Sequence, residues 1–214
     1  FFKHYRKKHD VGHVLLASHS DDGSGGGRQL VNSAKGLLAQ GVRVSVAVPG
    51  ESVIAEDLAD TKAEIVPHEN FSSKFATARF LRKVMKKRHA DVLHTYHSKT
   101  VKPGLLAILL DRLSGGNRKL FINRGVLFAP NPLYFLFARI AHGIICNSKP
   151  CAEVMRKRLV PRKRVFVVPN ALENADGLAE MQGTFGNNGL DEDTPFRVLY
   201  VGNGKPAKGF DIFA

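Results

Sequence analysis

The chain has 214 residues, a formal net charge of +13 and a hydrophobic fraction of 43%. These values suit a soluble globular protein with acidic partners, and the length suits one full α/β domain and the start of another. No uninterrupted apolar segment is long enough to cross a bilayer. Cys146 and Cys151 are the only cysteines. Their spacing fits neither a zinc site nor a disulfide framework, and we interpret them as free thiols in a reducing cytosol.

The first expected elements are a buried strand, a glycine-rich loop and a helix. Residues 14–17 form an apolar run typical of a strand buried on both faces, and helical spacing extends from Arg28 to Gly41. The loop between them, residues 23–27, reads Gly-Ser-Gly-Gly-Gly. Such a loop lets a ligand approach the backbone, and the helix start attracts anions. A dinucleotide fingerprint would need a third glycine where Arg28 stands, and a plain flexible loop is the alternative.

Strands and helices then alternate along the chain. Further strands are expected at residues 42–48, 64–66, 91–96, 119–122, 143–146, 165–168 and 196–201. Further helices are expected around residues 56–58 and over 71–88, 105–113, 134–137 and 148–159, with Pro103 in a first turn and Ser148 as an N-cap. The alternation predicts a Rossmann-like, doubly wound α/β fold with a mostly parallel sheet.

Four segments follow from this pattern. Residues 1–12 are a basic lead-in, 13–173 the Rossmann-like domain, 174–195 a polar linker and 196–214 the start of a second domain. The helix expected at 71–88 has a basic outer face without an acidic residue. Its cations are Lys74, Arg79, Arg82, Lys83, Lys86, Lys87 and Arg88. This face is either solvated surface or a site for an anionic partner, and residues 134–137 are either core or a lipid-inserting wedge.

Five motifs, in order along the chain, resemble those of family 4 glycosyltransferases. They are Gly25–Arg28 (the GG loop), Asp91–His97 ("DvvHtH"), Ile144–Ser148 ("iiavS"), Val167–Glu173 ("vipNGvd") and Tyr200–Asp211 ("yvGr…KGfd"). The resemblance implies a GT-B fold, of which this chain would be the acceptor-side domain and a truncated donor domain. It also implies transfer of a sugar from a nucleotide-sugar donor with retention and without an essential metal or other cofactor. A chain cut at both ends would be inactive alone.

The resemblance assigns roles to individual residues. Gly26 and Gly27 would lie near the donor diphosphate, and Lys205 and Lys208 would offset its charge. The second histidine of "HtH" is replaced by Tyr96, so either Tyr96 through its hydroxyl or the following His97 makes the catalytic contact with substrate. His94 is expected to be a buried, hydrogen-bonded core residue.

The acceptor side would come from other strand ends. Asn123, Arg124 and Ser148 are the candidates for acceptor binding, although residues 123–125 also suit a plain turn. The acceptor would be a glycan or glycolipid, lipid-linked or of lipopolysaccharide type, in cell-envelope polysaccharide synthesis. The enzyme would be cytoplasmic or peripheral at the inner face of an anionic membrane.

Two alternatives from other classes stay open. The charge of +13 also suits a basic α/β domain that binds nucleic acid, but no binding motif or aromatic platform among basic residues accompanies it. A non-catalytic sugar-binding fragment is the second alternative, because most of the donor domain is missing.

Overall fold

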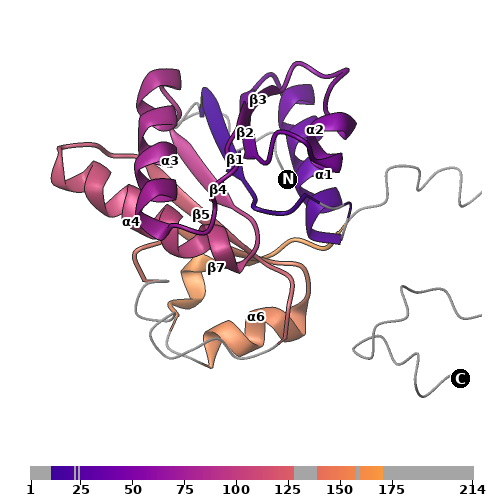
Figure 1. The fold of residues 1–214 in the computed structure, drawn as a ribbon. Helices are drawn as coiled ribbons and strands as arrows, with labels where there is room; N and C mark the ends of the chain where they lie inside the picture. Colours follow the sequence, from indigo (N-terminus) through magenta and orange to yellow (C-terminus); the bar gives the residue numbers. More distant parts are fainter. Residues whose placement is uncertain (1–10, 22, 24, 128–138, 158–159, 171–214) are drawn as a thin grey trace, which may run out of the picture. The chain divides into compact units, whose positions relative to one another are not determined.

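The computed structural model describes residues 11–21, 23, 25–127, 139–157 and 160–170 (Figure 1). The basic lead-in at 1–10, the expected helix at 134–137, the linker at 174–195 and the second domain at 196–214, with Lys205 and Lys208, lie outside the described residues. The division into domains therefore stays a prediction.

The described part of the chain forms one seven-stranded sheet in which every pair of neighbouring strands is parallel. Its strands are β1 (His13–Ala17), β2 (Arg43–Val48), β3 (Glu64–Pro67), β4 (Val92–Thr95), β5 (Lys119–Arg124), β6 (Gly143–Cys146) and β7 (Val165–Val167). The order β3-β2-β1-β4-β5-β6-β7 reverses direction between β1 and β4. The predicted α/β, Rossmann-like sheet is confirmed, and ligands of such sheets bind at this reversal.

Helices cover both faces of the sheet. They are α1 (Gly25–Ala39), α2 (Val53–Asp57), α3 (Lys74–Arg88), α4 (Ser98–Leu113) and α6 (Lys149–Arg156), with a short 3₁₀ turn at Arg162–Arg164. Alternate residues of β1 point to opposite faces of the sheet. Leu16 packs with α1 and α2, whereas Leu15 packs with α3 and α4 on the opposite side (Figure 1). The apolar strands are therefore buried on both faces, as their sequence predicts.

Three helices begin earlier than the sequence indicates, and one of them is α2, which starts at Val53 instead of near residue 56. α1 starts at Gly25, so the glycines form its first turn instead of a preceding loop. The first-turn N–H groups have no intrahelical partner in any sequence, and the low helix propensity of glycine costs least there. α4 starts at Ser98, which puts Pro103 inside the helix and not in its first turn, a correction to the expected position. Its missing N–H removes one intrahelical hydrogen bond there.

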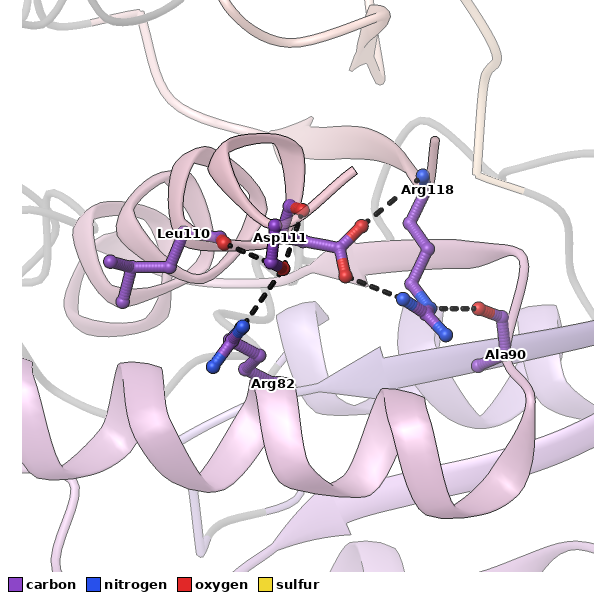
Figure 2. A network of polar contacts seen from close by, with 6 residues as sticks. Arg82, Ala90, Leu110, Asp111 and Arg118 are labelled. Atoms are coloured by element: carbon purple, nitrogen blue, oxygen red, sulfur yellow. Dashed lines mark hydrogen bonds and ion pairs between the residues drawn. The ribbon is translucent and has the colours of Figure 1, made fainter. Parts of the chain in front are cut away.

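A polar network holds the end of α4 against the rest of the domain (Figure 2). The side chain of Asp111 is fully buried, and its Oδ1 accepts a hydrogen bond from Arg118 Nη1 at 2.5 Å. The same guanidinium donates through Nε to the Ala90 carbonyl at 3.0 Å. A Cβ at Gly116 would lie 2.1 Å from Asp111 Oδ2, so glycine leaves room for the carboxylate. These contacts connect α4, the turn after it and β5.

Candidate functional site

The carboxyl ends of the central strands lie level with one another. Ala17 pairs with Thr95, and Thr95 pairs with Ile122, so the residues that follow β1, β4 and β5 meet at one edge. Ser18 and His97 leave this edge from β1 and β4. The candidate site is therefore built from segments that are far apart in the sequence.

His97 has a strained backbone. Its φ of 66° and ψ of 155° lie in a region that glycine normally occupies, and it caps the N-terminus of α4 without a side-chain cap bond. Such a conformation costs on the order of 1–3 kcal/mol and persists only where surrounding contacts impose it. Here the Ser18 hydroxyl lies 2.8 Å from His97 Nδ1, and the His19 ring packs edge-on with centroids 5.4 Å apart. Backbone outliers of this kind concentrate at active sites and ligand clamps.

The imidazole of His97 packs against the bare backbone of Gly26. A Cβ built at Gly26 would lie 2.2 Å from His97 Nε2, closer than any real contact. At Gly25 the same Cβ would meet nothing within 4 Å. Glycine at position 26 therefore makes room for His97, and the contact brings Nε2 to the first turn of α1.

Ser18 orients the His97 ring, a role that the sequence motifs do not indicate. Its side chain is fully buried, and Oγ already accepts a hydrogen bond from the backbone N–H of Ser20 at 3.0 Å. The Ser18 hydroxyl can donate to His97 Nδ1 or accept from it, and either hydrogen bond fixes the orientation of the ring. The only signal in the sequence is the position of Ser18, directly after β1 and before the glycines.

Tyr96 points into the core instead of the strand edge. Its side chain is 1% exposed, and its hydroxyl lies 3.3 Å from His94 Nδ1 between the sheet and α1. Burial raises the pKa of the Tyr96 hydroxyl, and it lowers the pKa of His94 to about 3. His94 is thus the buried, hydrogen-bonded residue that the sequence predicts. Of the two alternatives, only the half-buried His97 reaches the edge.

Asn123 and Arg124 end β5 and connect it to its neighbours. Asn123 Nδ2 donates to Gln29 Oε1 of α1 at 3.0 Å, while its Oδ1 is buried without a hydrogen-bond partner. The carbonyl of Arg124 accepts from the Asn147 N–H at 3.2 Å and from Cys151 Sγ at 3.3 Å. The amide of Asn123 therefore lies against the helix that begins with the glycines.

Ser148 is the N-cap of α6, as predicted. Its hydroxyl accepts a hydrogen bond from the Cys151 N–H at 3.4 Å. To bind the acceptor substrate, Ser148 would have to use the remaining lone pair or the hydroxyl hydrogen. Cys146 and Cys151 are free and buried, and burial, with the neighbouring Cys151, raises the pKa of the Cys146 thiol to about 12. The Cys146 thiol is therefore unreactive at neutral pH.

The other features of the described residues do not indicate a functional site away from this strand edge. Two surface hollows of about 470 Å³ and 530 Å³ lie at the amino ends of the strands, beside Asp91 and Lys119 and beside Arg43 and Lys62. No group of three or more His, Cys, Asp or Glu side chains in the described part of the chain could hold a metal ion. None of the helices described is long and apolar enough to span a membrane.

The parallel sheet and its flanking helices define a Rossmann-like domain. The profile of Glycosyltransferase Family 4 matches residues 23–175, and the chain belongs to this family. None of the curated sequences compared with the chain matches it.

Solved structures show the same fold at low sequence identity. Anabaena Alr3699/HepE, solved with UDP and glucose, is 17% identical with a TM-score of 0.58, covering 81% of this chain and 50% of that one. A glycosyltransferase from Rickettsia africae is 14% identical with a TM-score of 0.63, covering 89% and 52%. MurG from Acinetobacter baumannii is 21% identical with a TM-score of 0.54, covering 77% and 47%. The chain therefore spans about half the length of the structures it matches.

Proposed function

We propose that this chain is the acceptor-side part of a glycosyltransferase that moves a sugar from a nucleotide-sugar donor to a glycan or glycolipid acceptor. The observation that carries the proposal is the strained His97, whose Nδ1 is hydrogen-bonded to Ser18 and whose Nε2 lies against Gly26 at the start of α1. A strained, hydrogen-bonded histidine beside a glycine-rich helix start is an arrangement suited to an anionic, polyhydroxylated ligand. UDP and glucose in the HepE structure are ligands of that chemistry.

The donor diphosphate would bind at the first turn of α1. Gly26 and Gly27 offer backbone N–H groups without side chains, and the helix dipole favours negative charge there. The first turn of α1 contains no acidic residue that would oppose an anion. Lys205 and Lys208 stay proposed as donor-binding residues on the family resemblance alone. The fixed N–H donors would stabilise the charge on the leaving diphosphate without a metal.

His97 would act on the transferred sugar. In the tautomer that carries its proton on Nε2, the ring would donate a hydrogen bond to a sugar hydroxyl or to an oxygen that gains charge as the glycosidic bond breaks. Retention of anomeric configuration is part of the proposal and rests on the family resemblance. Tyr96 would support His97 only indirectly, since its hydroxyl is occupied in the core.

The acceptor would approach the ends of β5 and β6. The unsatisfied Oδ1 of Asn123 offers a hydrogen-bond acceptor to a sugar hydroxyl, and Arg124 and Ser148 follow on the same edge. The net charge of +13 favours an acceptor that carries phosphate or lies in an anionic membrane. We therefore propose a lipid-linked or lipopolysaccharide-type acceptor and a peripheral position at the inner face of the membrane.

Steady-state kinetics on a protein that includes a complete second domain tests the function. We expect transfer or slow hydrolysis of a UDP-sugar, and no turnover by the 214-residue chain alone, because catalysis needs groups on both sides of the sugar. His97→Ala should lower kcat about 10–100-fold, and Ser18→Ala should lower it less, since the ring remains but loses its orientation. Tyr96→Phe, at the adjacent position, is the matched control for His97→Ala. It should lower kcat less than His97→Ala does.

Two outcomes would contradict the proposal. Unchanged kinetics in a folded His97→Ala protein would remove the strand-edge site from catalysis. Salt-sensitive binding to random oligonucleotides, without nucleotide-sugar turnover, would favour the nucleic-acid alternative.

A further inference from the structure

The exposed face of α3 is uniformly basic. At 100° per residue, Phe75, Arg79, Lys83 and Lys86 fall on one stripe with Lys87 beside it, and all five are exposed. The opposite stripe packs into the core. It consists of Thr77, Ala78, Leu81, Val84 and Met85. The helix carries no acidic residue, so its outer surface presents only positive charge.

Two cations of α3 are already used inside the domain. Arg82 reaches from α3 to the end of α4, where Nη2 donates to Ser114 Oγ at 2.9 Å (Figure 2). Arg88 forms an ion pair with Glu64. Among the described residues, the side chains of Arg79, Lys83, Lys86 and Lys87 have no hydrogen bond or ion pair, and these four can contact an outside partner. We call them the α3 cations.

Large apolar side chains border the α3 cations. Phe75 is 74% exposed and lies one turn before Arg79 on the same stripe. Leu113 is 77% exposed and precedes Ser114, the residue that Arg82 contacts. Cations beside exposed Phe and Leu side chains are the composition of membrane-surface helices, in which the cations meet headgroups and the apolar groups enter the acyl boundary.

Acidic residues lie on the other face of the sheet. Between Arg43 and Lys62 the chain has no basic residue and four exposed acids. They are Glu51, Glu56, Asp57 and Asp60. The helix among them, α2, packs on the face opposite α3 (Figure 1). An anionic surface would attract the α3 side and repel the α2 side, which selects one orientation of the domain.

We propose that the outer face of α3 docks on an anionic phospholipid membrane, with the α3 cations on the headgroups and Phe75 and Leu113 at the acyl boundary. This docking does not depend on sugar transfer. It deepens the proposed function by naming the surface that would hold the site next to a membrane-embedded acceptor. A protein that docks without transferring sugar would disprove the function and leave the docking intact.

Vesicle co-sedimentation with the full chain tests the docking. Wild-type protein should bind vesicles that contain phosphatidylglycerol, should bind them less as salt rises, and should not bind pure phosphatidylcholine vesicles. The variant Arg79→Gln/Lys83→Gln/Lys86→Gln/Lys87→Gln should bind at least about 100-fold more weakly, because each cation contributes roughly a fivefold factor. Phe75→Ala should weaken binding about tenfold with the charges intact.

A matched variant removes the same charge elsewhere. Arg43→Gln/Lys157→Gln/Arg162→Gln/Lys163→Gln also deletes four exposed cations, all of them outside α3, and should bind vesicles nearly as well as wild type. Equal losses in the two charge variants would show that net charge alone drives binding and would overturn the proposal. Tighter binding to random-sequence RNA than to vesicles, lost in the α3 variant, would assign the face to nucleic acid and would equally overturn it.

Discussion

Three segments of the chain meet at the imidazole of His97. Ser18 follows β1, Gly26 begins α1, and His97 itself follows β4, so that Ser18 and His97 are 79 positions apart in the sequence. The hydrogen bond to Nδ1 and the contact of Nε2 with the Gly26 backbone fix the ring from both sides. At the scale of single residues, the contacts with Ser18 and Gly26 hold His97 in its strained conformation.

Gly26→Ala tests whether glycine at position 26 is needed to leave space for the His97 ring. The new methyl group would meet His97 Nε2 at 2.2 Å and should push the ring off the Ser18 hydroxyl. We expect the imidazole ¹⁵N NMR signals of His97 to shift and His97-dependent turnover to fall about tenfold or more. Alanine gains little helix propensity in the first turn, so any change in stability should come mainly from the displaced His97 ring.

Gly25→Ala is the control for this substitution. It adds the same methyl group one residue earlier, where nothing lies within 4 Å. Its His97 signals should match wild type. If the two alanine variants give the same His97 spectrum, the packing of His97 on Gly26 does not govern the position of the ring.

At the scale of elements, the end of α4 depends on a buried charge. Asp111 is fully enclosed, and Arg118 supplies both its ionic partner and a link to the Ala90 carbonyl (Figure 2). Breaking such a pair costs more than the pair contributes, because the remaining charge stays buried. The same helix end supports Ser114, which receives Arg82 from α3.

Arg118→Met should therefore destabilise the domain by about 3 kcal/mol, measured as the free energy of unfolding in urea. The double variant Asp111→Asn/Arg118→Met removes the charge as well and should recover part of the loss. If the free energy of unfolding of Arg118→Met lies within about 0.5 kcal/mol of the wild-type value, the role given to this network is wrong.

At the scale of the whole molecule, the buried His94 makes stability depend on pH. Burial lowers its pKa in the folded state to about 3, while the unfolded chain takes up the proton near its usual value of about 6.5. The folded-state pKa is the lower one, so no stability is lost above about pH 6.5 and stability falls as pH decreases from there towards about pH 3. At about pH 5 the loss should be roughly 2 kcal/mol.

Urea unfolding at several pH values, with His94→Gln alongside wild type, measures this contribution. Glutamine can still accept from the Tyr96 hydroxyl but does not titrate. The slope of the free energy of unfolding against pH should become smaller in the variant. It should not vanish, because burial also lowers the pKa values of His68 and His142. An identical pH profile in the two proteins would rule out His94 as a source of the slope.

Local sequence signals determined most of the architecture. Apolar runs such as Leu15–Ala17 can be buried on both faces only in a covered parallel sheet, and their alternation with amphipathic helices leaves few topologies. The glycines at the start of α1 and the polar strand ends also indicated the edge where the candidate site lies. These features depend on neighbours within a few residues, so the order of residues is enough to find them.

Only the tertiary structure shows that the Tyr96 side chain points into the core while His97 lies at the strand edge. The two residues are adjacent, and the side that each faces depends on where β4 ends and on contacts with Ser18 and Gly26 across the sheet. The start of α1 at Gly25 and the Asp111–Arg118 pair were likewise not visible in the sequence. Periodicity reports which face of an element is buried, whereas the partner of a particular atom is set by packing between segments distant in the chain.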